Sequence, residues 1–178
     1  VPDSRRRAPP MRESVRVRTV TADLIASAAA RAGGEPRVVT SGNAAVPWRL
    51  LRLLDETVER YRLHQLNAPH GIPARDGVVH ETCFVGAGMR RSARLSYVPA
   101  RLSQVPLLYG QTLRPDIVLV HTSVPHGGRV SLGISVNVLP AAIEAAKARG
   151  GVVLAQVNRQ MPYTFGDGEL DLDLFDGV

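Results

Sequence analysis

The sequence predicts an α/β fold in which an open, mainly parallel sheet carries helices on both faces. Short aliphatic runs alternate with segments of helical spacing, which is the pattern of strand-helix-strand units. The clearest run is residues 117–120, flanked by Pro115 and Pro125, and an unbroken apolar strand is typical of a sheet covered on both sides. Hydrophobic residues form 44% of the chain and aromatic residues 4%, so aliphatic strands beneath Ala-rich helices should dominate the core.

The domain is expected to span residues 20–178, after a flexible basic arm at residues 1–19. The arm carries three prolines among arginines and no hydrophobic period. The first helix should be capped by Thr21 and ended by Gly33 and Gly34, because glycine adopts positive backbone angles at little cost. A length of 178 residues is sufficient for one self-supporting core.

The next unit should be a strand at residues 37–40, a Gly42-Asn43 turn and a helix that opens at Pro47. Proline suits the first helical turn because the amide hydrogen that it lacks has no partner there. The apolar face of this helix is expected to carry Trp48, Leu51, Leu54, Val58 and Tyr61. Further elements should follow, namely strands at residues 62–66 and 82–85 and a helix from Gly86 to Arg94.

The remaining elements surround the central parallel strand at residues 117–120. A period-two pattern predicts a strand at residues 130–136, and an Ala-rich helix should cover residues 140–149 before Gly150 and Gly151. The last strand is expected at residues 152–156. No internal repeat interrupts this order, so the chain is interpreted as one layered domain.

The net charge of +6 is concentrated at the amino terminus. Residues 1–18 hold six arginines against two acids, which leaves +2 for the rest of the chain. Without a basic stripe interleaved with aromatic residues, no nucleic-acid partner is expected. No run of 18 apolar residues or signal-peptide pattern occurs, and Cys83 is the only cysteine. We therefore expect a cytoplasmic protein without a membrane partner.

The turns that follow strands are the candidate binding sites, because ligands of such sheets bind beyond the carboxyl ends of the strands. The first turn contains Gly42, Asn43, Ala44 and Pro47, whose small residues would let a substrate approach backbone amides and a helix amino terminus. A plain structural turn is the alternative. Residues 86–91 begin like a dinucleotide fingerprint but have arginine at the sixth position, so this partial match is weak.

The third turn gathers Gln156, Asn158, Gln160 and Met161 behind the last strand. Amide side chains at that position could hold a carbonyl oxygen as negative charge develops on it, which acyl transfer requires. Local hydrogen bonding within the loop is the alternative. The five histidines lack metal-ligand spacing, so no metal is expected, and Cys83 is interpreted as a buried small hydrophobe.

The ordered motifs resemble the amino-terminal domain of the acetyl-CoA hydrolase/transferase family, of the 4-hydroxybutyrate CoA-transferase type. The similarity spans roughly residues 20–170 and is more specific than any single turn. Its motifs are GNAAVP at residues 42–47, FVG at 84–86 followed by Arg90, YVP at 97–99, LSQVP at 102–106, DIVLV at 116–120, VSLGISV at 130–136, and AQVNRQMP at 155–162 followed by Gly166 and Asp167.

The resemblance implies a CoA-transferase-like fold and the exchange of coenzyme A between an acyl-CoA and a carboxylate. In this family the nucleophile is a glutamate of a second domain, so the resemblance implies that the catalytic carboxyl-terminal domain is absent from this chain and that no catalytic residue lies in it. Glu81, Glu144 and Glu169 are interpreted as solvated or ion-paired acids. The expected partners are the two substrates, a second domain or subunit, and further copies in an oligomer.

The sequence departs from the family at two turns expected to face the cleft. Ser123 and Pro125 stand in a Ser-Val-Pro-His turn where relatives have Ser-Pro-Pro-Asp, and residues 168–173 are acidic where relatives are apolar. Three functions therefore remain open. The chain is half of a CoA-transferase, half of a thioester hydrolase on the same scaffold, or a non-catalytic module that binds acyl-CoA or a partner.

Overall fold

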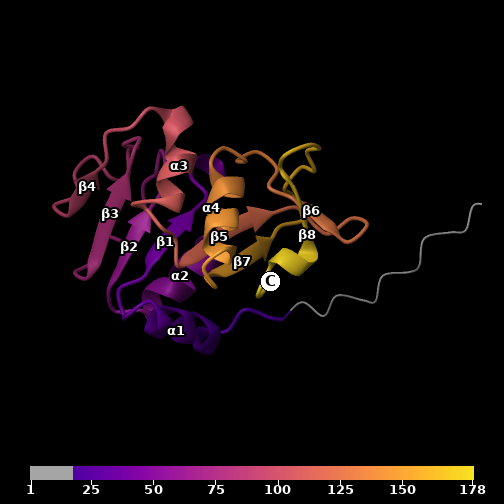
Figure 1. Cartoon of the computed structure of the whole chain (residues 1–178), viewed down its shortest axis with the longest axis horizontal. Helices are drawn as coiled ribbons and strands as arrows, with labels where there is room; N and C mark the ends of the chain where they lie inside the picture. Colours follow the sequence, from indigo (N-terminus) through magenta and orange to yellow (C-terminus); the bar gives the residue numbers. More distant parts are fainter. Residues whose placement is uncertain (1–17) are drawn as a thin grey trace, which may run out of the picture.

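The main sheet has the predicted parallel topology. A computed structural model describes residues 18–178, and six parallel strands lie in the order β4-β3-β2-β1-β5-β7 (Figure 1). They are β1 (Arg37–Thr40), β2 (Tyr61–His64), β3 (Val78–Thr82), β4 (Leu95–Tyr97), β5 (Ile117–Thr122) and β7 (Val152–Val157). A separate antiparallel pair consists of β6 (Arg129–Ser131) and β8 (Glu169–Asp171). Residues 1–17 of the expected arm lie outside the described residues.

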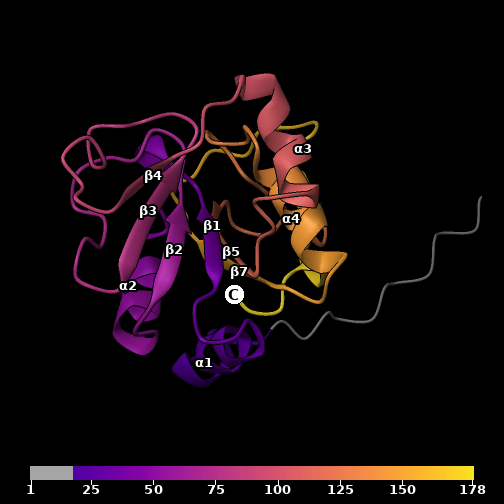
Figure 2. The same ribbon diagram turned by 60° about the vertical axis from the view of Figure 1, so that its left-hand side comes forward.

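Two helices cover each face of the main sheet (Figure 2). Helices α1 (Ala22–Arg31) and α2 (Trp48–Thr57) lie on one face, and α3 (Val105–Gly110) and α4 (Leu139–Lys147) on the other. Three short 3-10 helices are η1 (Asn43–Ala45), η2 (Leu102–Gln104) and η3 (Leu172–Leu174). No helix of residues 18–178 has the length and apolarity needed to cross a membrane.

Strand β5 lies at the centre of both cores. All six of its residues are buried, because it pairs with β1 on one side and β7 on the other beneath helices on both faces. Side chains alternate along a strand, so Leu119 joins the core under α1 and α2 while Val118 joins the core under α3 and α4. Burial on both faces explains why this strand reads as a continuous apolar run.

The first helix begins and ends where the sequence predicts. The Thr21 hydroxyl accepts a hydrogen bond from the Leu24 amide at 3.3 Å, which satisfies one of the unpaired first-turn donors. Gly33 and Gly34 follow the helix with φ angles of 79° and 86°. Such angles favour glycine strongly over residues with a Cβ.

Replacing Thr21 by alanine should therefore lower the free energy of unfolding by about 1 kcal/mol, because the cap is lost. Chemical denaturation of the two proteins measures this change. Ser27→Ala is the matched control, since Ser27 is exposed in the middle of the same helix and alanine has the higher helix propensity. Equal destabilisation by the two substitutions would contradict the capping role.

The predicted helix over residues 86–94 is wrong. This segment forms turns, and Gly86 and Gly88 lie against the backbone of the preceding loop. A Cβ at Gly88 would lie 1.9 Å from the Pro69 carbonyl oxygen, so the glycines serve close backbone approach rather than helix initiation or phosphate binding.

Several strand boundaries also differ from the prediction. Strand β3 occupies residues 78–82 rather than 82–85, and β6 ends at Ser131 because Gly133 turns the chain with a φ of 58°. Strand β2 begins at Tyr61 rather than residue 62. The predicted apolar face of α2 is confirmed only at Leu51 and Leu54, which are buried. Trp48 is 40% exposed, and Val58 and Tyr61 lie beyond the end of the helix. Strands β4 and β8 and helix α3 were not predicted.

A buried ion pair joins β1 to β3 across β2. The Glu81 carboxylate, in a residue only 2% exposed, accepts hydrogen bonds from Arg37 Nε at 2.8 Å and Arg37 Nη2 at 3.2 Å. Arg62 Nη1 lies 3.7 Å and His64 Nδ1 3.4 Å from the same carboxylate. Burial alone raises the pKa of Glu81, but His64 and Arg37 outweigh it and hold the pKa below its ordinary value. Glu81 is thus a paired structural carboxylate.

Candidate functional site

The ten predicted binding residues belong to three turns at one edge of the sheet, namely the first and third turns of the sequence analysis and the turn of Ser123 and Pro125. These turns follow β1, β5 and β7, which are adjacent parallel strands, so their carboxyl ends meet. From β1 the chain builds β2, β3 and β4 on one side of the sheet, and it then crosses to build β5 and β7 on the other side. The space between β1 and β5 is therefore the topological switch point of the sheet. Ligands of open α/β sheets bind at that position. The edge therefore combines all ten candidate residues: Gly42, Asn43, Ala44, Pro47, Ser123, Pro125, Gln156, Asn158, Gln160 and Met161.

The turn after β1 packs closely against the turn after β2, and two of its predicted binding residues are exposed. A Cβ at Gly42 would lie 2.0 Å from the Leu66 carbonyl oxygen, so only glycine fits beside the turn that follows β2. Asn43 has a positive φ of 51°, and its Oδ1 accepts a hydrogen bond from the side chain of Asn67. Asn43 and Ala44 are both exposed. The Asn43 Nδ2 donor is thereby presented at the edge.

The side chain of Gln156, near the end of β7, caps the amino terminus of helix α2. Its Oε1 accepts hydrogen bonds from the Arg49 amide at 2.9 Å and the Leu50 amide at 3.4 Å. These are first-turn donors that lack partners within the helix. The helix amino terminus after Pro47, which the sequence suggested as open to a substrate, is therefore occupied by a side chain of the protein.

Several other predicted side chains satisfy local backbone groups. The Ser123 hydroxyl donates to the Val124 carbonyl at 3.0 Å and accepts from the Ser131 amide at 2.9 Å. Asn158 Oδ1 accepts from the Gln160 amide at 2.9 Å. These contacts shape the turns, whereas the Gln160 side chain and Pro125 are exposed and Met161 is buried against Gly133.

Unpaired polar atoms gather beneath this edge. Thr40, Ser41, Gln65, His121 and Thr122 each bury a side-chain nitrogen or oxygen without a hydrogen-bond partner among residues 18–178. All five lie at the carboxyl ends of β1, β2 and β5 or directly after them. A buried unpaired polar group costs about 1–3 kcal/mol, so folds rarely concentrate them without a functional reason. Water or a polar ligand at this edge would supply partners for these atoms.

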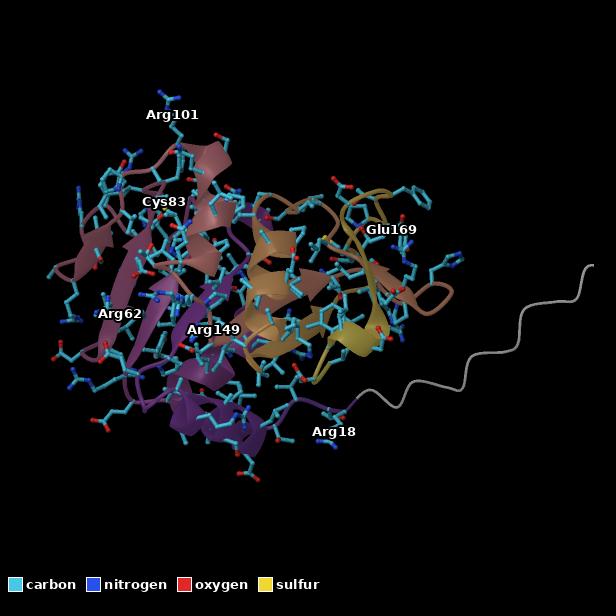
Figure 3. All side chains as sticks on the ribbon, in the orientation of Figure 1. Arg18, Arg62, Cys83, Arg101, Arg149 and Glu169 are labelled. Carbon is cyan, nitrogen blue, oxygen red and sulfur yellow. The ribbon has the colours of Figure 1, made fainter. Side chains whose placement is uncertain are left out.

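Burial favours the neutral forms of two ionisable side chains near the edge, His121 and Cys83. Burial lowers the pKa of His121, although the backbone of Val46 and Ala45 partly opposes it. Burial raises the pKa of the Cys83 thiol, and the charge of Glu81 adds to that effect. Cys83 lies between β3 and α3 (Figure 3), in agreement with its interpretation as a buried small hydrophobe.

The three glutamates considered in the sequence do not offer a free carboxylate at the site. Glu81 is paired with Arg37. Glu169 accepts from the Tyr163 hydroxyl at 2.8 Å and lies 3.4 Å from Arg129 Nη1. Glu144 is exposed on α4. Within residues 18–178, no three His, Cys, Asp or Glu side chains form a group that could hold a metal.

Arginines are spread over the structure. Arg62, Arg101 and Arg149 lie in separate parts of the molecule (Figure 3). Arg62 lies near two acids, Glu35 at 3.7 Å and Glu81 at 3.7 Å, so its charge is partly balanced locally.

The sequence reasoning missed Asn67 and underrated His121. Asn67 has a φ of 48° and binds Asn43, and His121 contacts Gln156 at 3.4 Å. Both residues lie at or just after the carboxyl end of a strand. The rule that selected the three turns could have identified them, since polar residues at these positions face the same edge.

Comparison with known proteins agrees with this geometry. The sequence model of the family described as acetyl-CoA hydrolase/transferase N-terminal domain matches residues 66–177. The chain belongs to this family. The match covers β3 to β8 and includes the turns after β5 and β7, while the turn after β1 lies before it.

Two curated acetyl-CoA hydrolase/transferase relatives are CoA transferases by name. A succinyl-CoA:acetate/propanoyl-CoA:succinate CoA transferase of Fasciola hepatica is 33% identical over 146 residues, which cover 75% of this chain and 30% of that protein. The 4-hydroxybutyrate coenzyme A transferase of Clostridium kluyveri is 29% identical over 155 residues, covering 80% and 35%. The chain thus spans about a third of the length of these relatives.

Solved structures show the same α/β fold. The 4-hydroxybutyrate CoA-transferase of Porphyromonas gingivalis aligns with a TM-score of 0.58 and 25% identity over 90% of this chain and 38% of that one. RipA from Yersinia pestis aligns with a TM-score of 0.69 and 20% identity, covering 81% of this chain and 38% of that one. The predicted CoA-transferase-like architecture is therefore confirmed.

Proposed function

We propose that this chain forms one wall of a CoA-transferase active site, with the nucleophilic glutamate supplied by a second domain or a partner chain. The reaction would move coenzyme A between an acyl-CoA and a carboxylic acid. The relatives named as CoA transferases and the switch-point edge support this proposal. The residues proposed for the wall are the ten candidates at that edge, of which Gln156, Ser123 and Asn158 would shape the wall through their local hydrogen bonds rather than contact the substrate directly.

The observation that carries the proposal is the apolar character of the same edge. Eight large hydrophobic residues among residues 18–178 are 40% to 81% exposed. Four of them lie at this edge: Phe84, Tyr97 and Val124 at or just after the carboxyl ends of parallel strands, and Trp48 at the start of α2. The other four are Leu102, Leu107, Ile134 and Phe165. Large exposed apolar surfaces usually mark interaction sites. This edge therefore suits a second domain that closes over the substrate.

A carboxylate from outside the described residues would complete the chemistry. One of its oxygens attacks the thioester carbon, the C–S bond breaks, and an acyl-glutamyl anhydride and a CoA thiolate result. The thiolate then attacks the glutamyl carbonyl, which releases the first carboxylate and leaves a glutamyl-CoA thioester. The acceptor carboxylate reverses both steps. Donors such as Asn43 Nδ2 and the Gln160 side chain would stabilise the developing oxyanion from this wall.

The purified 178-residue chain is expected to show no exchange between an acyl-CoA and a carboxylate, because the nucleophile is missing. The assay measures formation of new acyl-CoA from acetyl-CoA, propanoyl-CoA or succinyl-CoA with free carboxylates. The C. kluyveri relative, assayed with its own substrates, is the positive control. Turnover by the chain alone would overturn the proposal.

A chimeric enzyme containing this domain tests whether the reaction is CoA transfer or thioester hydrolysis. Residues 20–178 would replace the matching segment of the C. kluyveri relative, and circular dichroism would confirm folding. Formation of acyl-CoA only in the presence of an acceptor acid supports a transferase. Release of free coenzyme A without an acceptor would instead assign a thioester hydrolase. The cytoplasmic location, the oligomer and the independence from metal stay predictions.

A further inference from the structure

The orientation of the Gln156 amide follows from its partners. Backbone N–H groups can only donate, so the atom that Arg49 and Leu50 contact must be the carbonyl oxygen of Gln156. The Gln156 NH2 group then faces Nε2 of His121 at 3.4 Å. This assignment needs no hydrogen positions, because the alternative would place donors against donors.

The same reasoning predicts the protonation state of His121. An amide NH2 can only donate, so a hydrogen bond across this 3.4 Å contact requires His121 Nε2 to accept and to carry no proton. The ring is then neutral, and its proton resides on Nδ1, which is buried without a hydrogen-bond partner among residues 18–178. The hydrogen-bond partner of one ring nitrogen thus decides whether the other nitrogen carries the proton.

Burial lowers the pKa of His121 by more than the backbone of Val46 and Ala45 raises it, and no charged side chain of residues 18–178 opposes the neutral state. Helix α2 contributes Arg49, whose side chain is exposed, and β1 contributes Thr40. The turn at residues 42–47 has no ionisable side chain, and β7 places Gln156 in register with His121. No ion pair within the described residues includes His121, and burial is the main influence on its pKa.

We propose that Gln156 and His121 form a neutral hydrogen-bond relay that positions the turn after β1 and the start of α2 against β5 and β7. Gln156 caps α2, and His121 lies two residues before Ser123. Both are positioning residues: Gln156 is not a free oxyanion donor, and His121 is not a general base. An anionic ligand would have to displace Gln156 before it could use the amino terminus of α2.

Nitrogen NMR of the unmodified chain tests the first half of this inference. The ring shifts of His121 at pH 7 should be those of a neutral histidine with its proton on Nδ1, and His121→Gln should identify the signals. A proton on Nε2 or a charged ring at pH 7 would overturn the relay. The measurement uses no substrate, so its outcome is independent of the proposed CoA transfer.

Gln156→Glu tests the coupling between the two residues. A carboxylate at this position still accepts from the Arg49 and Leu50 amides, but it cannot donate to His121 and attracts a proton to the ring. The His121 titration should therefore shift to higher pH while the helix content stays unchanged. Gln111→Glu, at an exposed glutamine, should leave the titration unmoved. An unshifted His121 in Gln156→Glu would show that Gln156 acts only as a helix cap.

Discussion

Gly42→Ala is expected to lower the free energy of unfolding by about 3 kcal/mol, because it overpacks the contact between two turns. The new Cβ would lie 2.0 Å from the Leu66 carbonyl oxygen and 3.2 Å from its carbon. Both atoms are backbone, so no side-chain rotation can relieve the contact. The turn after β1 must move away from the turn after β2, which would also weaken the Asn43–Asn67 contact at the site. Urea denaturation measures the loss.

Gly110→Ala is the matched control for this substitution. A Cβ at Gly110 meets no atom within 4 Å, and the residue ends a helix without a positive φ. Alanine should therefore be neutral or slightly stabilising there. If Gly42→Ala were as stable as Gly110→Ala, the close approach of the two turns would be contradicted.

Glu81→Gln should cost about 3 kcal/mol of folding free energy, because removal of one partner leaves the other charge of a buried pair uncompensated. Arg37 is the partner that loses the carboxylate charge, since the glutamine amide keeps only one oxygen to accept from it. Replacing both residues, as in Arg37→Met with Glu81→Leu, should be less harmful than Glu81→Gln alone. Glu56→Gln is the control, since Glu56 is exposed on α2.

The contribution of Glu81 also depends on pH in a defined direction. Its pKa in the folded protein lies below the ordinary value of 4.5, so folding favours the ionised carboxylate. The stabilisation is fully present above the unfolded pKa and is lost as the pH falls through the folded pKa. The stability difference between the wild-type chain and Glu81→Gln should therefore shrink below about pH 4.5. A constant difference down to about pH 2 would refute the ion-pair assignment.

The sequence predicted the layered fold because its strongest signals are local. Strand β5 is apolar throughout since both of its faces are covered, and Thr21 and Gly33 mark the ends of α1 by capping and backbone angle. The segment at residues 86–94 was misread because a glycine pair has two uses. It can open a helix, or it can let two backbones touch, and only the position of Ala68 and Pro69 distinguishes them.

The candidate site could be located from the sequence but its chemistry could not be assigned. Residues at the carboxyl ends of parallel strands must share one edge, so Gly42, Ser123 and Gln156 were placed together by topology alone. Their individual partners depend on contacts between residues far apart in the chain, such as Gln156 with Arg49, which are 107 positions apart. No periodicity encodes such contacts.

The amino-acid sequence by itself determined the α/β class, the family and the edge at which a ligand should bind, because hydrophobic period, turn residues and ordered motifs are properties of short segments. Only the tertiary structure decided that Glu81 is a paired core carboxylate, that Gln156 closes the amino terminus of α2, and that exposed apolar side chains such as Phe84 and Val124 lie at the ligand edge. The physical reason is that burial, pairing and exposure arise from neighbours that the chain brings together from distant positions.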